Sequence, residues 1–111
     1  RGNLCGVLNT DLFFSTDISY INSAGQQRLV EFFTQSSATA FVIIGHTDAR
    51  ASDEYNLALS QRRANAVAKV AAANGANISD VRGYGERWPV ASNNTYSGMA
   101  KNRRVEIICI Q

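Results

Sequence analysis

The stretch of residues 41–64 constrains the fold more than any other part of this sequence. It opens with an apolar run, residues 41–44, whose members are β-branched or aromatic and which Gly45 closes. A run that is this short and ends at a glycine predicts a buried strand. A polar segment, residues 46–48, comes next, and an alanine-rich helical pattern follows it. We therefore expect a strand, a polar turn and a helix, with the turn side chains at a strand end, where they can face a ligand.

The whole chain is expected to form one domain, residues 1–111. With 111 residues, 45% of them hydrophobic, it can bury one core but is too short for two ordinary ones. Strands are predicted at residues 4–8, 39–44, 81–84 and 105–110, and helices at residues 23–35 and from Ser52 or Asp53 to about Asn74. This β-α-β-α-β-β order predicts an α+β fold, an α/β sandwich, in which a mixed four-stranded sheet packs helices on one face.

Some shorter patterns carry local predictions. Residues 9–20 and 93–98 are expected to be irregular connections, the first with Phe13 and Phe14 turned into the core. The Gly-Tyr-Gly of residues 83–85 lacks the third glycine of a dinucleotide-binding motif, so we interpret it as a tight turn after a strand.

The long predicted helix has a distinct apolar face. At about 100° per residue, one side collects five residues that must pack on the sheet: Leu57, Ala64, Val67, Ala68 and Ala71. Asn56 and Arg63 lie together on one flank of this stripe, whereas Arg62 points nearly opposite to it. Arg63 is therefore expected to lean over the edge of the sheet while Arg62 faces water.

Charge and hydropathy argue against several classes of protein. Eleven basic against nine acidic residues give a formal charge of +2, too mild to indicate nucleic-acid binding. No apolar stretch reaches the roughly 18 to 20 residues that span a bilayer. Because the sequence begins at Arg1 rather than methionine, the possibility stays open that the chain belongs to a parent protein tethered to a membrane upstream. One histidine and two distant cysteines make a poor zinc site, and we predict neither metal nor cofactor.

Cys5 and Cys109 lie near opposite ends of the chain, each in an apolar run. If the first and last strands were neighbours, a disulfide would close nearly the whole chain, as suits a secreted or periplasmic protein. The alternative is two buried thiols, because cysteine is often a small core residue. The sequence leaves both states open.

His46 and Asp48 together suggest catalysis, since a histidine oriented by a carboxylate is half of a nucleophilic triad. The sequence does not complete the triad, because no serine lies in a Gly-x-Ser-x-Gly turn and both cysteines lie in apolar strands. We therefore predict no catalytic residue and no enzyme activity. His46 is expected to be a neutral imidazole hydrogen-bonded within its turn, with a ligand contact as the alternative.

Asp48 and Arg63 form the better pair of candidates. They could form a salt bridge, or they could bind the two charges of a zwitterionic ligand, an ammonium on Asp48 and a carboxylate on the guanidinium fork of Arg63. The second arrangement would select an amino-acid head group. Arg103 could bind an anion or belong to an ion pair, whereas a structural role is expected for Arg104.

Separated motifs follow one another through most of the chain. In order they are Gly45-His46-Thr47-Asp48, Tyr55-Asn56-Leu57, Leu59-Ser60-Gln61-Arg62-Arg63-Ala64, Gly83-Tyr84-Gly85-Glu86 with Pro89, and Asn102-Arg103-Arg104-Val105-Glu106-Ile107. With these motifs the chain resembles the OmpA-like peptidoglycan-binding domain, the family that includes periplasmic domains of OmpA, Pal and the MotB stator proteins. The likeness extends from about residue 11 to residue 110.

This resemblance implies a specific ligand. It predicts non-covalent binding of the peptidoglycan peptide stem in the periplasm of a Gram-negative bacterium, usually through meso-diaminopimelate, whose far end carries an ammonium and a carboxylate. Asp48 would take the ammonium and Arg63 the carboxylate. By the same resemblance Asn56, Thr47, Thr16 and Asp17 would line the pocket, with Leu59, Arg103 and Arg104 supporting it.

The chain departs from the family pattern at a few positions. Ser15 stands where many members have aspartate, Ala51 stands where many have glycine, and the cysteine pair is not a general feature. These departures concern details of the pocket more than its existence.

The alternative function is an OmpA-like domain that interacts with proteins within a secretion, motility or envelope complex and has no working peptidoglycan site.

Overall fold

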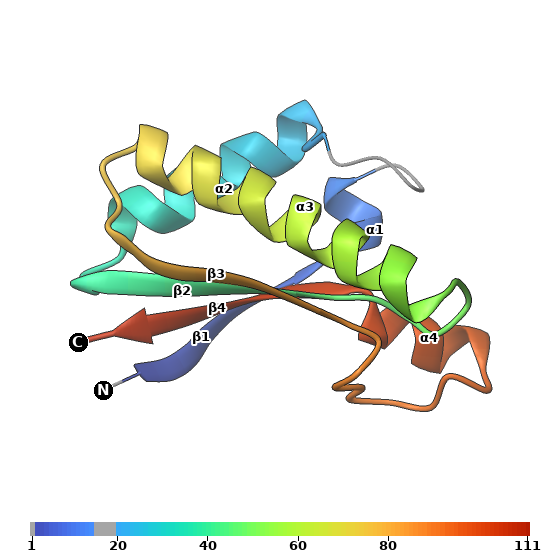
Figure 1. The fold of residues 1–111 in the computed structure, drawn as a ribbon. Helices are drawn as coiled ribbons and strands as arrows, with labels where there is room; N and C mark the ends of the chain where they lie inside the picture. The colour runs from blue at the N-terminus through green and yellow to red at the C-terminus, as the bar shows by residue number, and fades with distance from the viewer. Residues whose placement is uncertain (1, 15–19) are drawn as a thin grey trace.

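The fold is a single four-stranded sheet with helices on one face (Figure 1). A computed structural model describes residues 2–14 and 20–111. The elements are β1 (Gly2–Asn9), α1 (Thr10–Phe13), α2 (Ser23–Gln35), β2 (Ala40–His46), α3 (Asp53–Ala73), β3 (Ile78–Gly85), α4 (Tyr96–Asn102) and β4 (Arg104–Ile110). The predicted α+β class and the predicted order of strands and long helices are confirmed. The short helices α1 and α4 were not predicted and occupy the two segments expected to be irregular.

The order of the strands places the predicted polar turn at one end of the sheet, beside the start of β4 and the end of β3. The strands lie in the order β1-β4-β2-β3, in which β4 is antiparallel to β1 and β2, and β3 is parallel to β2. His46 at the end of β2 pairs with Arg104 at the start of β4 and with Gly85 at the end of β3. The residues that follow β2 and those that precede β4 are therefore neighbours.

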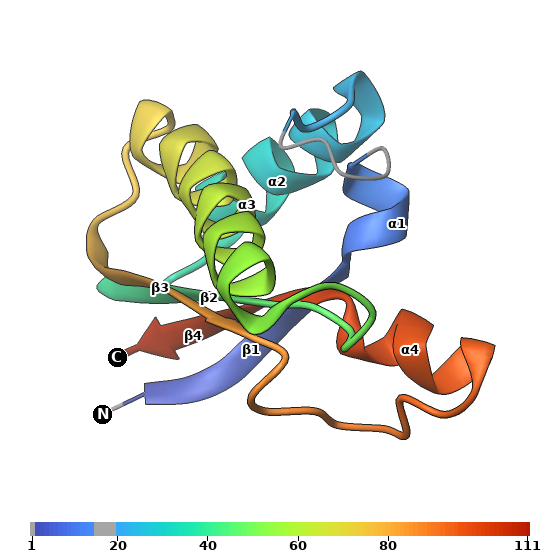
Figure 2. The ribbon, with the colours of Figure 1, turned by 45° about the vertical axis from the view of Figure 1, so that its right-hand side comes forward.

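The core lies between the sheet and the two long helices. Figure 2 shows α2 and α3 side by side over the sheet. Aromatic rings fill the space beneath α2, where the Phe33 ring contacts the rings of Phe32 and Phe41 with centroid separations of 5.2 and 5.0 Å. Beneath α3 the contact is made by small residues that include Ala64 and Ala71, both fully buried. The predicted apolar face of α3 is thus the packed face, although Leu57 is only half-buried.

Two glycines set how closely α3 approaches the sheet. A Cβ on Gly45 of β2 would lie 2.2 Å from the backbone oxygen of Ser60, and one on Gly83 of β3 would lie 2.4 Å from the backbone nitrogen of Gln61. The Ser60 hydroxyl accepts a hydrogen bond from the Gly85 N–H at 2.9 Å. The expected tight turn at residues 83–85 is therefore wrong: these residues belong to β3, and Gly83 is needed for contact with the helix.

The two short helices depend on side-chain caps. The Asn9 side chain accepts from the Asp11 N–H at 2.9 Å and begins α1, and the Thr95 hydroxyl accepts from the Gly98 N–H at 3.0 Å and begins α4. Asn102, fully buried, fixes the connection before α4 through bonds to backbone groups at residues 90 and 91. Helices of one or two turns give too little periodicity to be predicted from hydrophobic spacing.

Cys5 and Cys109 form a disulfide between β1 and β4, with their Cα atoms 5.7 Å apart. The two strands are neighbours, so the disulfide alternative holds rather than two free thiols. Of the helices in the described parts of the chain, none is both long and apolar enough to cross a membrane.

Candidate functional site

A cavity of about 460 Å³ opens where β2 ends and α3 begins. Its lining comes from α1 and the residue after it, the turn after β2, the first half of α3 and the residue before β4: Asp11, Phe14, Thr47, Asp48, Arg50, Ala51, Tyr55, Asn56, Leu59, Arg63 and Arg103. Most of the predicted site residues thus meet here. Arg104 is not in the lining, and Thr16, Asp17 and Ser15 fall outside the residues that the structure describes.

Asp48 is almost fully buried and yet remains an anion. Its Oδ2 accepts from Nη1 of Arg103 at 2.6 Å and from Nε of Arg50 at 2.9 Å, and its Oδ1 accepts from the Arg50 backbone N–H at 3.1 Å. Burial by itself would raise the pKa of this carboxyl group, but the bonds from Arg103 and Arg50 outweigh it, and the pKa lies below its usual value. The predicted ammonium acceptor is therefore charged at neutral pH.

Arg103 connects Asp48 to a second carboxylate. Its Nε and Nη2 donate to the two oxygens of Asp11, both at 2.9 Å, in the parallel two-bond geometry that suits guanidinium and carboxylate. Asp11 is the main cause of the raised pKa of Arg103, and Asp48 adds to it against the effect of burial. Of the two roles expected for Arg103, the ion-pair role describes its contacts.

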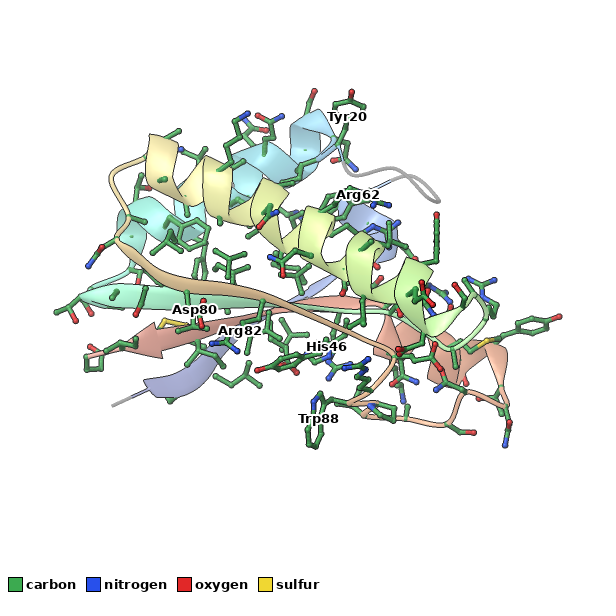
Figure 3. The ribbon with its side chains drawn as sticks, in the orientation of Figure 1. Tyr20, His46, Arg62, Asp80, Arg82 and Trp88 are labelled. Atoms are coloured by element: carbon green, nitrogen blue, oxygen red, sulfur yellow. A yellow bond between two sulfur atoms is a disulfide. The ribbon has the colours of Figure 1, made fainter. Side chains whose placement is uncertain are left out.

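Arg63 reaches the same cavity from α3. Its side chain is 5% exposed, and its guanidinium carbon lies 5.3 Å from the centre of the Phe14 ring, within the range of a cation–π contact. Arg62, the next residue back, is exposed and lines a different groove, between α2 and α3 (Figure 3). The helical spacing thus predicted correctly which of the two adjacent arginines turns toward the sheet edge.

Thr47 and Asn56 hold the turn that carries Asp48. The Thr47 N–H donates to the Gly85 oxygen at 2.9 Å, and its hydroxyl donates to the Asp48 oxygen at 2.8 Å. Asn56, 2% exposed, donates from Nδ2 to the backbone oxygens of Asp48 and Ala51 and to Oε1 of Glu86. With its amide nitrogen shared among these acceptors, Asn56 orients the turn in addition to lining the cavity.

Some lining residues were not predicted as site residues. Asp11 and Arg50 reach the cavity only because α1 and the turn after β2 fold toward Arg103 and Asp48, and the sequence carries no local pattern that indicates this. Phe14 was predicted as a core residue and is buried, but its ring also contacts Arg63. Tyr55, 39% exposed, belongs to the Tyr55-Asn56-Leu57 motif, and that motif is a signal that could have identified it.

His46 and Arg104 form a separate polar cluster on the opposite face of the sheet. Figure 3 shows His46 and Trp88 below the sheet, on the side away from α2 and α3. His46 Nε2 lies 3.1 Å from Oε1 of Glu106, and Arg104 donates to the same carboxylate at 2.9 Å and to the Trp88 oxygen at 2.9 Å. Burial first, and then the charge of Arg104, lower the pKa of His46 despite Glu106. His46 is thus a neutral, structural imidazole, bonded across strands rather than within its turn.

The chemistry of the cavity suits a ligand with both charges. Carboxylates of Asp11 and Asp48 and guanidinium groups of Arg63 and Arg103 line one space, with Leu59 supplying an apolar wall. Among the described residues, no group of three or more His, Cys, Asp or Glu side chains is placed to hold a metal ion. The arrangement can bind a polar zwitterion, and the described residues that line it include no paired nucleophile and base.

The sequence is similar to one protein family and to outer-membrane and peptidoglycan-associated proteins. The sequence profile of the OmpA family matches residues 13–103. The chain is 45% identical over 101 residues to outer membrane porin F of Pseudomonas fluorescens, covering 86% of this chain and 31% of that protein. It is 36% identical over 91 residues to the peptidoglycan-associated lipoprotein of Legionella pneumophila, covering 80% of this chain and 51% of that protein.

The fold is closely similar to that of a solved structure whose sequence identity to this chain is low. The cell wall anchor of the T6SS from Pseudomonas aeruginosa superimposes with a TM-score of 0.79 at 28% identity, over 94% of this chain and 78% of that one. The chain spans only 31% and 51% of the length of these two relatives, the porin and the lipoprotein, so the similarity concerns a part of each.

Proposed function

Because the chain belongs to the OmpA family, we propose that it binds the peptide stem of peptidoglycan non-covalently and anchors a parent envelope protein to the cell wall. Domains of this family are binding domains and not enzymes. Relatives named as an outer membrane porin and as a peptidoglycan-associated lipoprotein support a role in the Gram-negative envelope. The domain would work in the periplasm, an oxidising compartment that suits the Cys5–Cys109 disulfide.

The observation that carries the proposal is the convergence of Asp48 and Arg63 on one cavity. They come from different elements, the turn after β2 and the middle of α3, and both are about 5% exposed. The far end of meso-diaminopimelate offers an ammonium for Asp48 and a carboxylate for the guanidinium fork of Arg63. A cavity of about 460 Å³ lies within the usual size range of small-ligand sites, roughly 300 to 1,000 Å³.

The remaining predicted residues take different parts in this proposal. Leu59 provides an apolar wall, and Thr47, Asn56 and Arg103 position Asp48 through the bonds described above. Arg104 contributes only at a distance, since its guanidinium bonds are all on the other face of the sheet or to the chain before β4. Thr16 and Asp17 stay proposals that depend on the family resemblance.

The test is calorimetric titration with a muropeptide that contains meso-diaminopimelate. Asp48→Asn and Arg63→Ala should each weaken binding about tenfold or more, because each removes a charge-assisted hydrogen bond from a buried site. Arg62→Ala is the matched control: it removes the neighbouring, exposed arginine of α3 and should leave the affinity within about twofold. Thermal unfolding of each variant checks that it is folded. Unchanged affinity in both site variants would refute the assignment.

A second candidate function is favoured by one observation. Asp48 already pairs with Arg50 and Arg103, so the domain could keep the fold while serving only as a protein-interaction module of a secretion, motility or envelope complex. Incubation with purified sacculi separates the candidates. Retention of the wild-type domain, and loss of retention in Asp48→Asn, supports peptidoglycan binding, whereas no retention of the wild type supports the interaction module.

A further inference from the structure

Arg50 occupies the carboxylate that the proposed ligand would need. Its Nε and Nη2 both lie 2.9 Å from Oδ2 of Asp48, and its backbone N–H bonds Oδ1. Arg50 also lines the cavity itself. An ammonium group approaching Asp48 from the cavity therefore meets a carboxylate whose outer side is already covered by a cation of this chain.

The two arginines on Asp48 differ in how firmly they are held. Arg103 is 19% exposed at its side chain and is fixed by a second, two-bond pairing with Asp11. The Arg50 side chain is 60% exposed, and within the described part of the chain Asp48 is the only carboxylate it pairs with. An exposed arginine held by one partner is stabilised little by that partner, because water solvates the released guanidinium well. Arg50 is the cation that can leave.

We propose that Arg50 is an affinity-determining residue, a competitor built into the site that the ligand's ammonium displaces from Asp48 while Arg103 stays in place. This inference rests on the function proposed above. The backbone N–H of Arg50 can keep its bond to Oδ1 when the side chain swings out, so the turn need not refold. The ligand ammonium thus replaces the Arg50 guanidinium on Asp48, and breaking the Arg50–Asp48 pair reduces the net binding free energy of the ligand.

Removal of the competitor should therefore tighten binding. In calorimetric titration with the meso-diaminopimelate muropeptide, Arg50→Ala is expected to bind about two- to fivefold more tightly than the wild type, the range that corresponds to an exposed ion pair. Arg50→Lys, which keeps a cation able to reach Asp48, should remain within about twofold of the wild type.

The chain offers a closely matched control in Arg82. Like Arg50, Arg82 lies two residues after an aspartate, donates to that aspartate from Nε, and is 58% exposed. Its partner Asp80 does not line the cavity, and Figure 3 shows both residues toward the face of the sheet away from α3. Arg82→Ala removes an arginine of nearly the same exposure and the same formal charge, although its partner Asp80 is exposed where Asp48 is buried, so its affinity should equal that of the wild type.

The outcomes separate this inference from the proposed function. If the wild type binds, Asp48→Asn abolishes binding, and Arg50→Ala binds no more tightly than Arg82→Ala, the function stands and the role of Arg50 is refuted. Weaker binding by Arg50→Ala also refutes it, because Arg50 would then contact the ligand. Binding by none of these proteins refutes the function and the inference together.

Discussion

At the scale of single residues, the surroundings of a side chain decide its role more than its type does. His46 is the last residue of β2, next to the site, yet its ring lies on the face of the sheet opposite α3. There it is beside Glu106 and 5.9 Å from the Tyr84 ring centre. Asp48, two residues on, faces the cavity. β2 ends at His46, so Asp48 lies in the turn that follows and does not continue the side-chain alternation of the strand. The two side chains are therefore not neighbours, and the catalytic interpretation of this pair fails for that reason.

Protonation of His46 should couple stability to pH. In the unfolded chain the imidazole binds a proton near pH 6.5, whereas burial keeps it neutral in the folded protein until lower pH. The unfolded state therefore binds more protons in this window, and the free energy of unfolding should fall as pH drops below about 6.5. The slope contributed by one such group cannot exceed about 1.4 kcal/mol per pH unit.

A comparison with His46→Gln isolates this contribution, because the sequence contains one histidine. Urea unfolding at a series of pH values from 7.5 to about 5 should show a steeper loss of stability in the wild type than in the variant, while carboxylates that titrate in both cancel. Parallel curves would mean that His46 is protonated equally easily in the folded and unfolded states.

At the scale of elements, the docking of α3 on β2 and β3 builds the site. The helix carries Asn56, Leu59 and Arg63 to the cavity, and it can lie this close to the sheet because Gly45 and Gly83 have no side chains. α3 begins as predicted, with the Ser52 hydroxyl accepting from the Tyr55 N–H, and α2 is capped by the Asn22 side chain, which accepts from the Gly25 N–H. Capping residues are ambiguous in sequence when two candidates are adjacent.

A methyl group at Gly45 should push α3 away from the sheet. The Cβ of Gly45→Ala would lie 2.2 Å from the Ser60 backbone oxygen, so the helix must shift, at a cost of about 1–3 kcal/mol in unfolding free energy and with weaker muropeptide binding. Gly6→Ala is the control, since its Cβ meets its nearest neighbours at 3.4 Å. Denaturant unfolding and calorimetry measure both effects. Equal stability of the two variants would contradict this account of the close approach.

At the scale of the whole molecule, the sheet order joins the two ends of the chain. β1 is an edge strand that pairs with β4, the last strand, and the disulfide links them across a sequence separation of 104 residues. The edge strand β1 contacts the rest of the fold mainly through β4 and α1. The disulfide therefore closes nearly the entire chain and keeps its first element in the sheet.

Loss of the disulfide should be costly for stability but not for the site. In the chain-entropy description a loop of about 100 residues corresponds to roughly 4 to 5 kcal/mol, and we expect Cys5→Ala with Cys109→Ala to lose about 3–5 kcal/mol of unfolding free energy. Urea unfolding with and without reductant measures it, and the reductant should affect only the wild type. Muropeptide affinity, measured at a temperature where the variant is folded, should be unchanged. A loss of unfolding free energy below about 1 kcal/mol would show that strand pairing alone holds β1 in the sheet.

The sequence by itself determined the local framework: a buried strand, a polar turn, a long helix with Arg63 on its packed side, and the α+β class. These follow from periodicity, capping and steric preferences that act over a few residues. Only the tertiary structure decided which charges meet. Arg103 reaches Asp48 across 55 residues and Asp11 across 92, and the two cysteines pair across 104. Such contacts depend on the order of the strands and on how α3 packs, because a long-range ion pair leaves no periodic signal in the residues that form it.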